Sequence, residues 1–312
     1  MTKQRNLIVG LDGTLNDATA SDQTSNVVQF LDSLFRRGHV QHYEEGVGTA
    51  HWEVLPGGIY GEGLDRQILG GYRFLRKRFT DADWQPDHNR VFIIGFSRGA
   101  YAARRLAGLV DYCGLPRGEA DVNLAWNLYL TQDHASIAEL KAQGRLFAIT
   151  IEMLGVWDTV KATNDGDFHD HTLPACVNFG YHAVSIDEKR KFFPVLSWNS
   201  DKRVREVWFA GVHSDVGGGY SERGLSDITL RWMIDRAHEL GLRFLATKMH
   251  KLKDDPQAQI HESYEGLWQT FGTRKRSMVT SALVHDSVRV RIEGPAKYNP
   301  GNLPENPNYV IA

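Results

Sequence analysis

The sequence is poor in cysteine, lacks a long hydrophobic run and carries no excess of charge of one sign. Its 2 cysteines, Cys113 and Cys176, lie far apart in no C-x-x-C pair, so we expect free thiols rather than a disulfide framework or a thiolate zinc site. No stretch approaches the roughly 18 apolar residues of a transmembrane helix, and the apolar run at residues 7–9 is too short for a signal-peptide core. We therefore expect a protein without a transmembrane segment, either cytoplasmic or exported without a cleavable signal peptide. Peripheral contact with a membrane stays open.

The balance of charge argues against nucleic acid as a partner. The chain has 36 lysines and arginines against 38 aspartates and glutamates, a net charge of −2. Because proteins that bind nucleic acid rely on an excess of basic charge, we expect no such partner. The 312 residues, 42% hydrophobic and 24% charged, are typical of a globular protein with a sizeable core. Composition leaves the oligomeric state open.

Apolar runs predict the buried strands of a parallel sheet, and a polar residue follows each run. The runs lie at residues 7–11, 91–94, 146–157 and 207–212. The polar residues that follow them are Asp12, Ser97, Asp158 and His213. Since ligands bind outside the carboxyl ends of the strands in open α/β sheets, we expect these four side chains to converge on one edge.

Segments with helical spacing of apolar residues alternate with these runs, at residues 25–37, 65–79, 99–110 and 227–240. The alternation predicts an α/β fold, with a mostly parallel sheet flanked by helices in a single domain over residues 1–312. Residues 161–203 and 246–312 are the candidate positions for cap or lid elements. Within them, the sequence indicates a charged helix near residues 187–190 and a strand at residues 288–292.

The pentapeptide Gly95-Phe96-Ser97-Arg98-Gly99 is the strongest motif in the chain. It matches G-x-S-x-G, with an apolar strand before it and a helix-forming run after it. In such a nucleophile elbow, the serine sits in a sharp strand-to-helix turn, and the residues two before and two after it are too close for side chains. We therefore predict that Ser97 is a nucleophile.

A serine nucleophile needs a histidine base and a carboxylate that fixes the tautomer of the histidine. Asp158 and His213 follow Ser97 in the chain order Ser, acid, His that is typical of α/β-hydrolases. His213 precedes a glycine-rich turn, and we predict that it is the base. Asp158 is the predicted acid; Asp111 and Asp215 are its rivals, although Asp215, two residues from His213, is better suited to bracing the loop.

Acyl transfer also needs hydrogen-bond donors for the developing oxyanion. We expect one from the backbone N–H of Arg98, the residue after the nucleophile. The second donor is expected from the turn at Asp12 and Gly13, after the first strand.

Several segments together resemble a widespread α/β-hydrolase domain family, a domain of unknown function (number 2235) that includes the type VI secretion phospholipase effectors. The segments that carry the resemblance are Leu11 to Asn16, Gly46 to Thr49, Gly61 to Asp65, Gly95 to Ala100, Gly155 to Val160, Asp187 to Arg190, Gly211 to Tyr220 and His285 to Ser287. The resemblance implies a triad of Ser97, Asp158 and His213, and the hydrolysis of carboxylic esters without a cofactor. The resemblance implies phospholipids as substrates. Large effectors of the family, however, carry extra regions that engage membranes, and we expect 312 residues to hold little beyond the catalytic domain. A soluble small-molecule ester is therefore an alternative substrate.

Three other interpretations are weighed against this one. Residues 11–15 resemble the D-x-D-G-T-L motif of haloacid-dehalogenase-type phosphatases, but Gly10 stands where their nucleophilic aspartate belongs. Histidines and aspartates at residues 167–171 could bind a metal, yet a solvated loop is favoured, and we expect no metal. A non-catalytic binding module on the same fold is the third alternative; labelling by a fluorophosphonate would distinguish it from the hydrolase.

Overall fold

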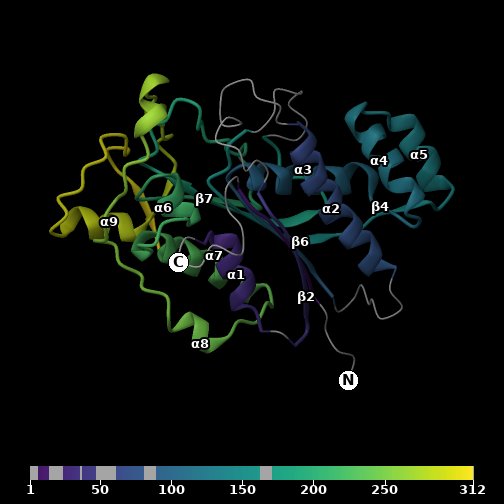
Figure 1. Cartoon of the computed structure of the whole chain (residues 1–312), viewed down its shortest axis with the longest axis horizontal. Helices are drawn as coiled ribbons and strands as arrows, with labels where there is room; N and C mark the ends of the chain where they lie inside the picture. Colours follow the sequence, from purple (N-terminus) through teal and green to yellow (C-terminus); the bar gives the residue numbers. More distant parts are fainter. Residues whose placement is uncertain are drawn as a thin grey trace.

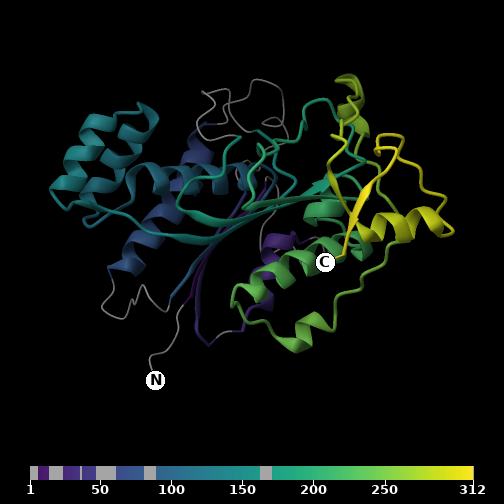
Figure 2. The same cartoon turned by 180° about the vertical axis from the view of Figure 1, so that it is seen from behind.

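The computed structural model is built around one parallel sheet (Figures 1 and 2). The residues that the structure describes are 6–13, 24–35, 37–46, 61–80, 89–161 and 171–311. The eight strands of the sheet lie in the order β10-β9-β8-β7-β6-β3-β1-β2, and every neighbouring pair is parallel. The strands are β1 (Asn6–Leu11), β2 (His39–Glu44), β3 (Val91–Phe96), β6 (Ile151–Trp157), β7 (Val177–Ser185), β8 (Val204–Phe209), β9 (Leu283–His285) and β10 (Asn308–Val310).

Helices cover both faces of this sheet (Figures 1 and 2). The described helices are α1 (Asn26–Ser33), α2 (Gly61–Phe79), α3 (Ser97–Cys113), α4 (Ala120–Leu130), α5 (His134–Ala142), α6 (His213–Gly217), α7 (Gly224–Glu239), α8 (Ala246–Met249), α9 (Asp286–Glu293) and the 3-10 helix η1 (Gly266–Thr270). A short antiparallel pair, β4 (Leu115–Pro116) and β5 (Leu146–Phe147), lies apart from the main sheet.

The strands next to the site are buried on both sides. Alternate residues of β3 belong to two hydrophobic clusters: Val91 and Ile93 pack with α2 and α3, whereas Phe92 and Ile94 pack with α1 and α7. This double burial explains why such strands are continuous apolar runs rather than alternating patterns.

The order of the strands reverses between β1 and β3. From β1 the chain passes through α1 to β2 on one side, and after α2 it returns to β3 on the other side of β1. In open α/β sheets, ligands bind in the crevice at such a reversal. Asp12 and Ser97, which follow β1 and β3, lie at this point of the sheet edge.

The predicted α/β fold and most of its predicted elements are confirmed. β1, β3, α1, α2, α3 and α7 fall within a few residues of their predicted ranges, and β8 ends at Phe209 rather than at residue 212. The run at residues 146–157 divides into β5 and β6, which belong to different sheets.

Two local predictions are wrong. Residues 187–190 form a bend and an isolated bridge to Thr273 instead of a helix. Residues 288–292 lie in α9 instead of a strand. The regions suggested for cap or lid elements also contribute β7, β9 and β10 to the main sheet. A cap or lid in the rest of these regions stays a prediction.

Candidate active site

Ser97 stands at the turn between β3 and α3, in a backbone conformation that side chains rarely adopt. Its φ is +58°, in the left-handed region. A Cβ on Gly95 would lie 2.5 Å from the carbonyl oxygen of Gly99, and a Cβ on Gly99 would lie 2.3 Å from the carbonyl oxygen of Leu11. The two flanking glycines therefore let α3 begin directly against the ends of β3 and β1, as expected for a nucleophile elbow.

Replacing Gly99 should test this close packing. We expect Gly99→Ala to lower the free energy of unfolding by about 2 kcal/mol or more, because the new methyl group would collide with backbone rather than with a flexible side chain. Ester turnover should fall with it, since the collision displaces the turn that carries Ser97. Urea unfolding and turnover measured on the same samples would check both effects.

Gly118→Ala is the matched control, because only Asp121 Oδ2, at 3.9 Å, lies near its added Cβ. A fully stable and active Gly99→Ala variant would show that the elbow is looser than the structure indicates.

His213 reaches Ser97 from the other half of the sheet. It is the first residue of α6, four residues after β8 ends, and its Nε2 lies 2.8 Å from the Oγ of Ser97. The ring lies between Phe96 and Phe193, with ring centroids at 4.7 and 5.1 Å. These contacts restrict the orientation of the imidazole, and His213 is buried.

Asp158 lies directly after β6 and completes a chain of three side chains. Its Oδ2 lies 2.5 Å from Nδ1 of His213, and its own φ is +41°. A carboxylate can only accept, so Nδ1 carries the proton and Nε2 is left to accept the hydroxyl proton of Ser97. The three predicted residues thus meet at hydrogen-bonding distances, with Asp158 fully buried and Ser97 8% exposed.

Burial sets the acid–base state of His213. It lowers the pKa of the imidazole below its usual value, because a charged ring is poorly solvated there. The hydrogen bond to Asp158 opposes this effect. The lowered pKa favours the neutral imidazole, which is the form that can accept a proton.

Sequence reasoning missed Arg276, which contacts both carboxylate oxygens of Asp158. The guanidinium donates from Nη1 to Oδ1 at 2.5 Å and from Nη2 to Oδ2 at 3.0 Å. Burial alone would raise the pKa of Asp158, but Arg276 and the hydrogen bond from His213 hold it well below its usual range. No motif marks an arginine 118 residues beyond its partner, so a sequence signal was lacking.

A second group of residues holds the backbone of His213. The N–H of His213 donates to Oε2 of Glu188 at 3.3 Å, and Glu188 is in turn paired with Arg190 through both oxygens. The Arg190 guanidinium lies over the Phe193 ring at 3.6 Å. Glu188 and Arg190 belong to a segment that the family resemblance included, although no role was assigned to it.

The two rival acids have other partners. Asp215 accepts from the N–H of Val212 at 2.9 Å and from His261 at 2.6 Å, so it braces the loop before His213. Asp111 accepts from the N–H of Cys176 at 2.6 Å.

The turn at Asp12 and Gly13 is ordered by the carboxyl group of Asp12. This group accepts from the N–H of Gly13 at 2.7 Å, from Ser25 at 2.5 Å and from Tyr43 at 3.0 Å, and burial raises its pKa to about 6. The N–H of Gly13 is thus engaged by Asp12. The expected oxyanion donors at this turn and at Arg98 stay a prediction.

In the part of the chain that the structure describes, no group of three or more histidine, cysteine, aspartate or glutamate side chains is arranged so that it could hold a metal ion. Most of the segment at residues 167–171 lies outside the described residues. The 2 cysteines are free thiols.

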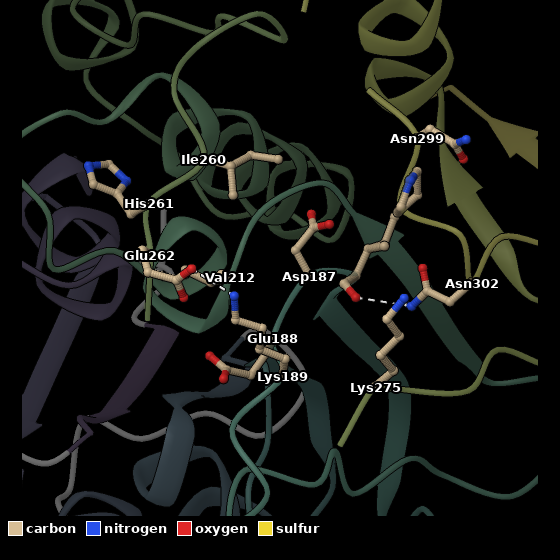
Figure 3. Close-up of a pocket in the computed structure, with 12 residues that line it drawn as sticks. Asp187, Glu188, Lys189, Val212, Ile260, His261, Glu262, Lys275, Asn299 and Asn302 are labelled. Carbon is tan, nitrogen blue, oxygen red and sulfur yellow. Dashed lines mark hydrogen bonds and ion pairs between the residues drawn. The ribbon is translucent and has the colours of Figure 1, made fainter. Parts of the chain in front are cut away.

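A cavity of about 370 Å³ lies beside Val212, the residue that precedes His213 (Figure 3). Val212 and Glu188 line it, but Ser97, Asp158 and His213 do not. Lys189 and Glu262 both line the cavity and form an ion pair at 2.7 Å. Asp187, from the same segment as Lys189, and Lys275, from a later segment, also line it (Figure 3). Its lining is mainly polar and charged, so it is unsuited to an acyl chain.

The fold and the arrangement of these side chains define an α/β-hydrolase-type protein. The chain belongs to the family of type VI secretion (T6SS) Tle1-like phospholipase effector catalytic domains, whose model matches residues 5–236. Both the fold and the phospholipase family differ from those of haloacid-dehalogenase-type phosphatases, which argues against the phosphatase alternative.

Individual relatives are distant and longer. The uncharacterized protein YEL023C of Saccharomyces cerevisiae is 28% identical over 230 residues, which are 62% of this chain and 32% of the yeast protein. A crystal structure of an uncharacterized protein from Pseudomonas aeruginosa is 21% identical, with a TM-score of 0.54, over 80% of this chain and 49% of that one. A Tle1 effector bound to the VgrG spike of the type 6 secretion system is 18% identical, with a TM-score of 0.40, over 70% of this chain and 52% of that one. The chain thus spans between a third and about half of the length of these proteins.

Among the described residues, no helix combines the length and the apolar character needed to cross a bilayer.

Proposed function

We propose that the protein is a serine hydrolase that cleaves carboxylic esters through an acyl-enzyme formed on Ser97. The observation that carries the proposal is the unbroken series of hydrogen bonds from Ser97 through His213 to Asp158, at the reversal of strand order. The three side chains come from the ends of three different strands, so their meeting is a property of the fold rather than of one local motif.

The chemistry follows from the direction of these hydrogen bonds. Nε2 of His213 takes the hydroxyl proton of Ser97 as its Oγ attacks the ester carbonyl, and Asp158 stabilises the imidazolium that forms. The N–H of Arg98 stabilises the oxyanion in this proposal, and a second donor from the Asp12–Gly13 turn requires the N–H of Gly13 to leave the carboxyl group of Asp12. His213 then protonates the leaving alcohol, and a water molecule activated by His213 hydrolyses the acyl-enzyme.

Membership of a phospholipase effector family supports a phospholipid as the natural substrate. We propose phospholipase activity first and a soluble carboxylic ester as the alternative, because the chain spans only part of its relatives. The same membership supports export through type VI secretion, rather than a cytoplasmic role.

A substrate screen would test this proposal. We expect hydrolysis of p-nitrophenyl esters of several chain lengths, and release of fatty acid from phospholipid in detergent micelles at a higher kcat/KM. A preference for short esters, with no release of fatty acid, would favour the soluble alternative. Absence of ester hydrolysis and of fluorophosphonate labelling would contradict the proposed function.

A further inference from the structure

We propose that Arg276 is the positioning residue for the catalytic acid: it holds the carboxylate of Asp158 in the orientation that His213 requires and adjusts the basicity of His213. This inference rests on the proposed hydrolase function. It assigns a role to a residue 40 positions beyond the end of the family match at residue 236.

Arg276 completes the hydrogen bonding of a carboxylate that has no contact with water. Oδ1 of Asp158 accepts from the N–H of Ser185 at 2.9 Å and from Nη1 of Arg276 at 2.5 Å. Oδ2 accepts from His213 at 2.5 Å and from Nη2 of Arg276 at 3.0 Å. A carboxylate offers about four acceptor positions, and here all are used, so the group cannot rotate without breaking several bonds.

The guanidinium is itself held in place. Nη1 donates to the carbonyl oxygen and the hydroxyl of Ser185, and Nη2 donates to the carbonyl oxygen of Phe193, the residue whose ring packs on His213. The amide of Asn302 donates to the backbone carbonyl of Arg276. With its side chain only 4% exposed, Arg276 is a fixed cation against a fully buried anion.

Charge and geometry have opposite consequences for His213, which makes the role testable. The cation near Asp158 disfavours the imidazolium, so Arg276 lowers the basicity of His213. The two hydrogen bonds from the guanidinium to the two carboxylate oxygens, here called the fork, improve turnover because they fix the orientation of the Asp158 carboxylate. Removing Arg276 should therefore raise the pKa of His213 while slowing the reaction, a combination that simple loss of folded protein would not produce.

The experiment compares Arg276→Met, Arg276→Lys and wild type by the pH dependence of kcat/KM and of the fluorophosphonate inactivation rate. We expect Arg276→Met to lower kcat roughly a hundredfold and to move the acid limb of both profiles upward by about half a unit or more. The other charged groups that face His213 are Asp158, Glu188 and Arg190, and they are unchanged in all variants. Arg276→Lys keeps the charge but loses the fork, so its acid limb should stay near that of wild type while kcat falls by less.

A smaller folded fraction of Arg276→Met lowers the inactivation rate constant at most in proportion to that fraction, and it does not move the acid limb. A further variant, Arg276→Ala, tests whether free guanidinium can replace the missing side chain. Millimolar guanidinium, far below denaturing concentrations, should partly restore the ester turnover of Arg276→Ala but not that of Ser97→Ala. Arg274→Met, an exposed arginine of the same segment, is the matched control and should behave as wild type.

If Arg276→Met has the same acid limb and the same inactivation rate constant as wild type, the inference about Arg276 is wrong, whereas the proposed hydrolase function still stands. If wild type itself neither turns over esters nor reacts with the probe, the proposed function fails instead.

Discussion

Ser97→Ala should lose ester turnover by roughly 10⁴- to 10⁶-fold and should no longer react with a fluorophosphonate. The hydroxyl is the only group of Ser97 that changes, and its Oγ lies 2.8 Å from the imidazole that is expected to deprotonate it. Without the hydroxyl no acyl-enzyme can form, and only the slower attack of water remains. Initial rates on a short p-nitrophenyl ester and gel-based probe labelling would measure the two losses independently.

Ser33→Ala is the control for this prediction, because Ser33 is a buried serine of α1 whose hydroxyl donates only to a backbone carbonyl within its own helix. It should keep normal turnover and labelling. His213→Ala should resemble Ser97→Ala in turnover. If Ser97→Ala retains near-normal rates while probe labelling moves to another residue, a different nucleophile must be sought.

The part of the fold around the proposed site could be predicted because its signals are local. A strand buried on both faces is a continuous apolar run, as in β1 and β3. The turn at Ser97 requires small residues at fixed spacing, which Gly95 and Gly99 provide. Since parallel strands end at the same edge of a sheet, the polar residues that follow β6 and β8 could also be placed near Ser97.

The rest depends on contacts that leave no local pattern. β7 mixes polar and apolar residues, including Asn178, Gly180 and His182, so it resembles a loop in sequence although it occupies the centre of the sheet. Residues 288–292 alternate as a strand would, yet α9 forms because Val288 and Arg291, three residues apart, are buried on one helical face.

Asp158→Asn should be the most damaging single change to the acid–base system after loss of Ser97 or His213. The amide must direct its N–H₂ either toward His213 and Nη2 of Arg276 or toward Arg276 and Ser185, and all of these are donors. His213 would lose the partner that fixes its tautomer, so kcat should fall by roughly 10⁴-fold. The charge of Arg276 would be left buried without a counter-ion, which should cost about 3–5 kcal/mol in the free energy of unfolding. Ester kinetics and urea unfolding would measure the two effects.

The double variant with Asp158→Asn and Arg276→Met separates stability from catalysis. Removing the unpaired cation should restore much of the lost free energy of unfolding, giving a coupling of about 1–3 kcal/mol in the double-mutant cycle, while kcat stays low. Asp32→Asn, in an exposed pair with Lys248, should be neutral in both measurements. If turnover recovers together with stability, Asp158 acts only by balancing the charge of Arg276. If instead Asp158 orients His213, removing Arg276 cannot restore turnover, because His213 still lacks its carboxylate.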